Sequence, residues 1–284
     1  MGDRVLIAGC GFVGTRLAEL LAQRGCDVFA LRRGEVRPPP GVRPLRADLA
    51  RIETLDCLPL DIDVVVYAAG AGAPSEEAYR AAYLDGVDRL FRVLRARGEA
   101  PRRVLFCSST AVYAQRRGEW VDEDSPTRPT RFNGELLLSA ERMLQAVVRG
   151  AIVLRLGGIY GPGRTRLIDR VRSGESRVRP NPHFTNRIHR DDAAGVLETL
   201  ALAEAPLYDR YLGVDDEPAD EADVLRFLAS RLGVDEPALS ESVSGPPERA
   251  GSKRCRNTRI RSEGYRFTYP SFREGYAAML AEST

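Results

Sequence analysis

A glycine-rich segment near the start of the chain is the first feature that could do chemistry. Residues 9–14 (GCGFVG) follow a short apolar stretch at 4–8 and open an amphipathic stretch at 12–24. In a strand–turn–helix unit, the first glycine of G-x-G-x-x-G allows a tight turn, the second lets the backbone approach a pyrophosphate, and the third lets the helix pack against the strand. The N–H groups at the start of the helix then face the phosphates. We predict that this turn binds a dinucleotide through Gly9, Gly11, Phe12, Val13 and Gly14.

The end of the next apolar stretch, 27–31, indicates which dinucleotide is bound. An acidic residue at this place holds the ribose hydroxyl of NAD, whereas arginine accommodates the extra phosphate of NADP. The chain has Arg32 and Arg33 here, so we expect NADP, with NAD as the second choice. The alternative is that both arginines form a solvated strand end. The adenine and ribose side of the same site is expected to comprise Asp48, Leu49, Ala68, Ala69 and Gly70.

The first half of the chain alternates between short apolar runs and helix-length stretches. This alternation predicts an α/β fold, a Rossmann doubly wound parallel sheet, with a smaller C-terminal substrate lobe. We expect residues 1–156 to form the dinucleotide-binding domain, with 186–215 returning to it, and 157–185 and 216–284 to form the lobe. The predicted strands are 4–8, 27–31, 42–46, 63–68, 102–108, 151–156 and one near 209–214, and the predicted helices are 12–24, 76–97, 132–149, 191–204, 219–232 and 271–282.

Composition narrows the class of protein. A net charge of +2 is too small for a nucleic-acid binder. The five cysteines are scattered without a C-x-x-C pair, so neither a metal site nor a disulfide framework is indicated. No apolar run approaches the roughly 20 residues of a membrane span, and no signal peptide precedes the first strand. We expect a soluble, cytoplasmic protein whose partner is a small-molecule substrate.

Five segments resemble the extended and atypical short-chain dehydrogenase/reductases, the NAD-dependent epimerase/dehydratase family. They are 9–14, 65–70 (VVYAAG), 108–113 (SSTAVY), 155–163 (RLGGIYGPG) and 186–192 (NRIHRDD). The resemblance implies a nicotinamide cofactor and an oxidoreductase or epimerase activity. It also implies a serine that hydrogen-bonds the substrate oxygen, and Ser109 occupies that place. Members of the family often pair through long helices such as those predicted at 76–97 and 132–149, so a homodimer is one expected assembly.

The chain departs from this family at the residues that move the proton. Where the family has Tyr-x-x-x-Lys, this sequence has Asn133 and Leu137, which excludes the ordinary mechanism, because asparagine is neither acid nor base near neutral pH and leucine carries no charge. Three replacements remain open. Tyr113, with Arg117 nearby, could donate a proton or only pack; Glu135 could act as acid or base; and Asn133 could orient a carbonyl.

Other polar residues leave further alternatives open. His189 could serve as acid or base, although a structural place beside a helix capped by Asp191 or Asp192 is favoured. An anionic substrate would suit the arginines of the predicted lobe, which could equally form a solvated face: Arg164, Arg166, Arg170, Arg172, Arg177, Arg179, Arg187 and Arg190. The sequence therefore predicts an NAD(P)-dependent enzyme with a non-standard site, or a non-catalytic NADP sensor of the same fold.

Overall fold

A seven-stranded sheet organises the first part of the computed structural model, which describes residues 2–34, 37–240 and 251–282. Its strand order is β11-β7-β5-β4-β1-β2-β3. The neighbouring pairs β1–β2, β1–β4, β2–β3 and β4–β5 are parallel. The strands are β1 (Arg4–Ala8), β2 (Asp27–Arg32), β3 (Val42–Arg46), β4 (Val64–Tyr67), β5 (Arg103–Ser109), β7 (Ile152–Leu156) and β11 (Arg210–Gly213).

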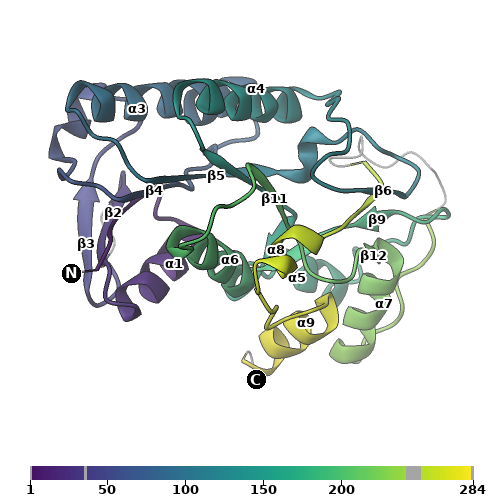
Figure 1. Ribbon diagram of the computed structural model, residues 1–284. Coiled ribbons are helices and arrows are strands. Elements are labelled where there is room, and N and C mark those ends of the chain that lie inside the picture. The colour runs from purple at the N-terminus through teal and green to yellow at the C-terminus, as the bar shows by residue number, and fades with distance from the viewer. Residues whose placement is uncertain (1, 35–36, 241–250, 283–284) are drawn as a thin grey trace. The chain divides into compact units, whose positions relative to one another are not determined.

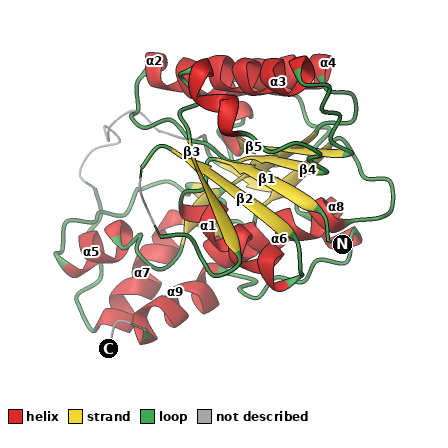
Figure 2. Ribbon diagram, turned by 90° about the vertical axis from the view of Figure 1, so that its left-hand side faces the viewer, coloured by secondary structure: helices red, strands yellow, loops and turns green. Residues whose placement is uncertain are grey.

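Helices cover both faces of this sheet, as the apolar strand runs require. β4 is buried along its whole length, which is typical of a strand sandwiched between two helical layers. Helices α3 and α4 lie on one face and α1 and α6 on the other (Figure 1; Figure 2). The prediction of a doubly wound α/β fold is confirmed. The helices of these layers are α1 (Phe12–Gln23), α2 (Glu76–Tyr79), α3 (Gly86–Ala96), α4 (Phe132–Val147) and α6 (Arg190–Leu202), with short 3-10 turns η1 (Ile52–Cys57) and η3 (Thr110–Val112).

The helix predicted over 76–97 is interrupted. A π-helical segment, η2 (Arg80–Asp85), separates α2 from α3. The buried Tyr67 hydroxyl of β4 donates a hydrogen bond to the Ala82 carbonyl inside this segment. A Cβ on Gly86 would lie 2.5 Å from the same hydroxyl. Close approach of the helix to the tyrosine therefore coincides with the widened turn, and sequence periodicity alone gives no sign of it.

The chain divides into two compact units. The first comprises Met1–Val112, Thr127–Arg155 and Ala194–Tyr211, and the second comprises Tyr113–Pro126, Leu156–Ala193 and Leu212–Thr284. The second unit contains three two-stranded sheets, β8–β10, β9–β12 and β6–β13. Its elements are β6 (Glu119–Val121), β8 (Gly158–Tyr160), β9 (Phe184–Thr185), β10 (Arg187–His189), β12 (Ala219–Asp220), β13 (Lys253–Cys255), α5 (Arg166–Arg172), α7 (Glu221–Leu232), α8 (Thr258–Ser262) and α9 (Phe272–Ala281).

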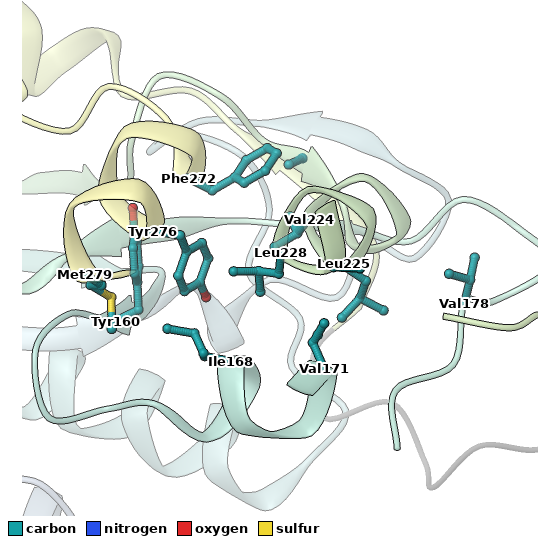
Figure 3. Close-up of a cluster of buried hydrophobic side chains, with 12 residues drawn as sticks. Tyr160, Ile168, Val171, Val178, Val224, Leu225, Leu228, Phe272, Tyr276 and Met279 are labelled. Carbon is teal, nitrogen blue, oxygen red and sulfur yellow. The ribbon is translucent and has the colours of Figure 1, made fainter. Parts of the chain in front are cut away.

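The second unit has an apolar core of its own. Side chains from α5, α7 and α9 meet around the buried Leu228, Phe272 and Tyr276 (Figure 3). α7 and α9 agree with the predicted helices, whereas α5 and the short strands were not predicted, because two to seven residues are too few to show a periodicity. Among the helices of the described residues, we find none with the length and apolarity that a membrane span requires.

Candidate active site

The glycine turn lies between β1 and α1, where the sequence predicts it. Gly9 has a φ of +101°, a conformation that L side chains rarely adopt, and a Cβ there would lie 2.2 Å from the Ala69 nitrogen. A Cβ on Gly14 would lie 2.7 Å from the Gly9 carbonyl oxygen and 3.2 Å from Ile7. Gly9 therefore lets the turn touch the loop after β4, and Gly14 lets α1 pack on β1.

Gly11 differs from its two neighbours in the motif. A Cβ built on Gly11 would meet no protein atom within 4 Å, so the fold itself does not require glycine here. Gly11 is the N-cap of α1, where no side chain provides a capping hydrogen bond, and the first turn of the helix contains no acidic residue. An open space in front of an uncompensated helix N-terminus fits the pyrophosphate of a dinucleotide. Phe12 and Val13 form the first turn of this helix.

The two arginines at the end of β2, Arg32 in the strand and Arg33 directly after it, lie beside this turn and the loop that follows β4. Arg32 is half-buried, and its positive charge lowers the pKa of the Cys10 thiol in the glycine turn, against the larger raising effect of burial. A terminal nitrogen of Arg33 lies 3.6 Å from where a Cβ on Gly72 would be. The end of β2 therefore presents two guanidinium groups at the same edge of the sheet as Gly11. This placement fits a phosphate monoester on the adenosine ribose.

Asp48 and Leu49 follow β3 and belong to the same unit. The Asp48 carboxylate accepts a hydrogen bond from the Ala50 N–H at 3.0 Å, and the Asp48 N–H donates to the Thr54 hydroxyl at 2.9 Å. Leu49 is nearly buried, and its Cβ would lie 3.4 Å from a Cβ on Gly86. These contacts fix the turn after β3. Ala68 and Ala69 after β4 are half-buried and Gly70 is exposed.

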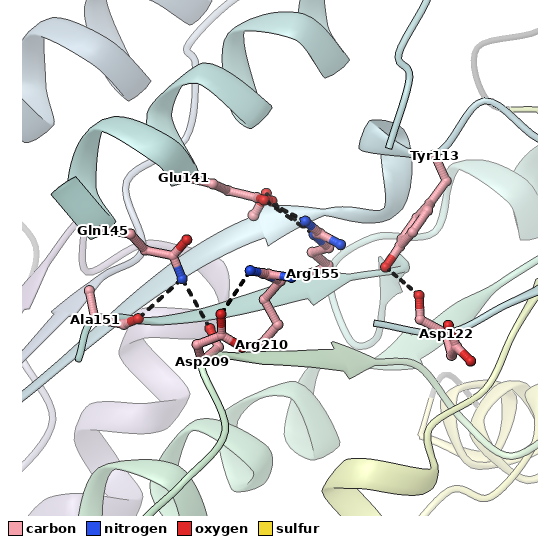
Figure 4. A network of polar contacts seen from close by, with 9 residues as sticks. Tyr113, Asp122, Glu141, Gln145, Ala151, Arg155, Asp209 and Arg210 are labelled. Carbon is pink, nitrogen blue, oxygen red and sulfur yellow. Dashed lines mark hydrogen bonds and ion pairs between the residues drawn. The ribbon is translucent and has the colours of Figure 1, made fainter. Parts of the chain in front are cut away.

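Two adjacent serines end β5 and have different surroundings. Ser108 is buried and donates a 2.5 Å hydrogen bond to the Glu141 carboxylate, which also accepts from the Arg155 guanidinium at 2.7 Å (Figure 4). Ser109 is half-buried, and its hydroxyl oxygen accepts from the Ala111 N–H at 3.2 Å. Within the described residues, the Ser109 hydroxyl proton has no acceptor. Ser108 serves the buried ion pair, while the geometry of Ser109 is compatible with donation to a substrate oxygen.

The first two turns of α4 hold the residues that stand in place of the Tyr-x-x-x-Lys pair. A Cβ on Gly134 would lie 2.5 Å from the Ala111 carbonyl oxygen, so α4 packs closely against the turn that follows Ser109. Asn133 is half-buried, Leu137 is 3% exposed and Glu135 is exposed. Glu135 thus lies on the solvent side of the helix, whereas Asn133 is half-buried and precedes Gly134 in the first turn.

Tyr113 begins a segment of the second unit and is engaged within it. It is 3% exposed, and its hydroxyl donates a 2.8 Å hydrogen bond to the Asp122 carbonyl oxygen. A phenol proton held by a backbone carbonyl is not available for donation in this arrangement. This contact favours the packing alternative for Tyr113 over the proton-donor alternative.

Tyr83 is a polar residue at this site that the sequence did not indicate. It lies in η2, its hydroxyl oxygen is 3.7 Å from where a Cβ on Gly70 would be, and its ring meets Phe106 of β5 edge-on at 6.3 Å. Burial raises the pKa of the Tyr83 hydroxyl to about 12, so it is a neutral donor at physiological pH. No motif marks it, because its position depends on the π-helical turn.

In the second unit, most of the arginines singled out from the sequence have partners within the fold. Arg172, Arg179 and Arg190 form ion pairs with Asp169, Glu221 and Asp191, respectively. Arg164 and Arg177 donate to backbone carbonyl oxygens, Arg187 donates to the Thr185 hydroxyl, and Arg166 and Arg170 are exposed. These contacts support the solvated and structural alternative for this set more than a shared anion site.

His189 is a buried structural histidine. Its Nδ1 accepts a 3.2 Å hydrogen bond from the Asp191 N–H, and its ring stacks on Tyr269 with the centroids 4.0 Å apart. Burial lowers the pKa of His189 to about 4. Asp192, one of the two expected caps, instead accepts from the Tyr265 hydroxyl and the N–H groups of residues 268 and 269. The imidazole, rather than the Asp192 carboxylate, accepts the N–H at the start of α6.

Over residues 2–34, 37–240 and 251–282, no group of three or more His, Cys, Asp or Glu side chains could hold a metal ion.

Comparison of the sequence with known proteins shows the family to which the chain belongs. Residues 5–193 match the model of the NAD dependent epimerase/dehydratase family. A 3-diazoavenalumate denitrifying reductase from a Streptomyces species is 30% identical over an alignment that covers 96% of this chain and 98% of the relative.

Solved structures agree with this match. A protein from Methylobacillus flagellatus, described as an NAD-dependent epimerase/dehydratase, superposes with a TM-score of 0.83 at 35% identity, over 100% of this chain and 99% of that one. MoeE5 in complex with UDP-glucose and NAD superposes with a TM-score of 0.79 at 25% identity, over 99% of this chain and 98% of that one.

Proposed function

Since the chain belongs to the NAD-dependent epimerase/dehydratase family, we propose that it is an NADP-preferring oxidoreductase or epimerase acting on a small anionic alcohol or carbonyl compound. The observation that carries the proposal is Gly11. Its missing side chain leaves open the space in front of the α1 N-terminus, although the fold would accommodate a Cβ there. A glycine that the fold does not need is explained by a ligand that approaches the backbone.

The preference for NADP rests on Arg32 and Arg33. Arg32 ends β2 and Arg33 follows it, on the side of the glycine turn, and guanidinium groups bind a phosphate monoester through charge-assisted hydrogen bonds. The anionic character of the substrate is proposed from two similar proteins. One is a reductase named for 3-diazoavenalumate, a carboxylate, and the other, MoeE5, forms a complex with UDP-glucose, which carries a diphosphate. NAD is the second choice, since it is the dinucleotide in the MoeE5 complex.

In this proposal, the residues of the chain have separate roles in binding the cofactor and in handling the substrate. The N–H groups at the start of α1 bind the pyrophosphate, and the two arginines bind the ribose phosphate. The nicotinamide, when bound, supplies or accepts hydride. Ser109 Oγ donates a hydrogen bond to the substrate oxygen, and Asn133 orients the same group through its amide. Tyr83, as a neutral phenol beside Gly70, is a better placed proton donor than Tyr113, whose proton is held by Asp122.

The test has two steps. Calorimetric titration should show tighter binding of NADPH than of NADH to the wild-type chain. Hydride exchange between bound NADPH and a panel of anionic carbonyl compounds should then be lost in Ser109→Ala and retained in Ser139→Ala, whose exposed hydroxyl donates to the Glu135 carbonyl oxygen of its own helix. Absence of affinity for either dinucleotide would overturn the proposal.

A second candidate function is a non-catalytic NADP sensor. It is favoured by one observation, the apolar Leu137 buried at the place of the family's lysine, because a leucine there cannot support proton transfer. Tight NADPH binding with no hydride exchange in any member of the panel, and no effect of Ser109→Ala on the biological response, would favour the sensor.

A further inference from the structure

Lys253 is the only lysine of the chain, among 42 basic residues. It lies in β13 of the second unit and is 1% exposed, which makes it one of the largest fully buried side chains. The four-carbon stem of a lysine usually carries its ammonium group to water. A lysine enclosed to this extent needs a physical reason, because burying an unpaired charge costs several kcal/mol, on the order of the stability of a domain.

The ammonium group of Lys253 lacks a partner in the part of the chain that the structure describes. Among the described residues, no hydrogen bond or ion pair reaches its Nζ atom. Burial lowers the pKa of Lys253, and the opposing influence comes from the Cys255 thiol. Burial also raises the pKa of that thiol to about 12. Cys255 is therefore uncharged near neutral pH and cannot serve as a counter-ion.

Two glutamates close to Lys253 in the β6–β13 sheet and the residues after it, Glu119 and Glu123, have other partners. Glu119, its partner in the β6–β13 register, is exposed and accepts a 2.7 Å hydrogen bond from the Arg117 N–H. Glu123, two residues after β6, is buried and accepts from the Leu212 N–H at 2.9 Å, with the Arg259 guanidinium 3.7 Å away. Neither of these two glutamates is paired with the lysine.

The backbone around Lys253 is held in place on both sides. The Asn186 amide donates to the Lys253 carbonyl at 3.0 Å and accepts from the Cys255 N–H at 2.8 Å. The preceding residue, Ser252, accepts the Gly118 N–H on its carbonyl at 2.9 Å and the Phe184 N–H on its hydroxyl at 3.0 Å. A strand fixed by four hydrogen bonds sets the origin of the lysine stem.

The neighbouring Arg254 shows which way the strand faces. Its guanidinium lies between the rings of Trp120 and Phe184, 4.9 and 4.8 Å from their centroids. Successive side chains of a strand point to opposite sides, so Lys253 and Cys255 share the other, buried side, in agreement with their 1% exposures. Arg254 therefore anchors the strand, whereas the Lys253 ammonium group has no anion bonded to it in the described part of the chain.

We propose that Lys253 is the centre of an oxyanion-binding subsite in the second unit, which receives the carboxylate or phosphate group of the substrate. The proposal rests on the proposed function, which supplies an anionic substrate. A pre-positioned cation that lacks a counter-ion gains a charge-assisted hydrogen bond when the ligand's oxyanion arrives. The arginines of the second unit are less suited to this task because many of them already pair within the fold.

The single lysine allows a direct test by NMR on the full-length chain. Biosynthetic labelling with [13C,15N]lysine gives one side-chain spin system, and its 13Cε shift reports the charge on Nζ. We expect the pKa of Lys253 to rise by about one pH unit or more when an oxyanion binds, because an opposite charge within about 4–6 Å favours the charged form. Pyrophosphate and UDP provide the phosphate arm, and D-glucuronate and benzoate provide the carboxylate arm. The arm that moves the pKa identifies the source of the oxyanion.

Substitution gives a second, independent readout. Lys253→Met should weaken the effective probe about 10- to 100-fold, the range of a hydrogen bond to a charged group, and Lys253→Arg should retain part of the affinity. Arg231→Met, at an exposed position of the same unit, is the matched control and should leave affinity unchanged. Lys253→Met should also unfold at a higher urea concentration than the wild type, because it removes an unpaired buried charge, whereas loss of a structural lysine would lower the midpoint.

The proposal and the proposed function fail in different ways. If NADPH binds to the wild type but neither arm shifts the Lys253 pKa, and Lys253→Met binds every probe as the wild type does, the oxyanion subsite is overturned while the dinucleotide site stands. If NADPH does not bind but a probe still shifts the pKa, the subsite stands and the proposed function falls.

Discussion

Arg155 and Glu141 form an ion pair that is almost closed to solvent. The guanidinium donates to both carboxylate oxygens at 2.7–3.3 Å, and each side chain is 3% exposed (Figure 4). The pair joins α4 to β7, and Ser108 of β5 donates to the same carboxylate. One helix and two strands of the first unit therefore meet at Glu141, and the Ser108 that contacts it is the neighbour of Ser109 in β5.

This pair predicts a large cost for removing one charge. Glu141→Gln keeps the shape and an acceptor for Ser108 but leaves Arg155 uncompensated, which should lower the free energy of unfolding by about 3–5 kcal/mol. Asp169→Asn, which breaks a pair whose members are each 54% exposed, should cost less than about 1 kcal/mol. Urea unfolding measures both. The double variant Glu141→Leu/Arg155→Met should lose much less free energy of unfolding than the sum of the losses of Glu141→Leu alone and Arg155→Met alone. Additive losses would contradict the coupling.

The three glycines of the turn should separate folding from binding. Gly11→Ala places a methyl group in open space, so its unfolding midpoint should match the wild type, whereas NADPH affinity should fall tenfold or more, about 1.4 kcal/mol. Gly9→Ala should instead destabilise the chain by about 2 kcal/mol or more, because of the positive φ and the 2.2 Å contact with Ala69. Calorimetry and urea unfolding on both variants provide the comparison. Equal NADPH affinity in wild type and Gly11→Ala would place the pyrophosphate elsewhere.

The arginines after β2 should control the choice between dinucleotides. Arg33→Ala should weaken NADPH about 10- to 100-fold, the range of one charge-assisted contact, and should leave NADH within a few-fold of the wild-type value, because NADH lacks the ribose phosphate. Arg32→Ala should act in the same direction. Arg51→Ala, an exposed arginine paired with Glu53, is the control. The same loss of affinity for both dinucleotides would mean that the arginines do not bind the ribose phosphate.

Local features of this protein could be predicted from its sequence. The glycine spacing at 9–14, the apolar strand runs and the helical periods depend on residues close together in the chain. The strands of the main sheet and the long helices are found where they were predicted, except that the helix predicted at 76–97 is interrupted by η2. The family resemblance is likewise confirmed by the match over 5–193. These signals are local because strand alternation and helix amphipathicity repeat within a few residues.

Features that depend on contacts across the fold could not be predicted. Glu141 and Arg155 are separated by 14 positions, and nothing in their spacing indicates that a helix and a strand bring them together. Tyr83 reaches Gly70 only because η2 widens the helix. Lys253 is the only lysine in the sequence, but its enclosure involves the pairing of β13 with β6, two strands of three residues each.

His189 predicts how stability depends on pH. Its imidazole accepts the Asp191 N–H and stacks on Tyr269, and burial lowers its pKa to about 4, whereas a histidine in the unfolded chain has a pKa of about 6.5. Between about pH 6.5 and pH 4, His189 is therefore protonated in the unfolded chain but remains neutral in the folded chain. The contribution of His189 is complete above this value and is lost as the pH falls towards 4.

The variant His189→Asn isolates this effect, because its amide oxygen can replace Nδ1 as the acceptor but does not titrate. Between pH 7.5 and pH 5 the free energy of unfolding of the wild type should fall by about 2 kcal/mol more than that of the variant. The buried carboxyl groups of Asp192 and Asp215, whose pKa values are raised by burial, act in the opposite direction but are present in both proteins, so their effect cancels in the difference. Urea titrations at the two pH values measure it. Parallel pH dependences of the two proteins would show that His189 is charged in the folded state, and the neutral acceptor assigned to the start of α6 would then be wrong.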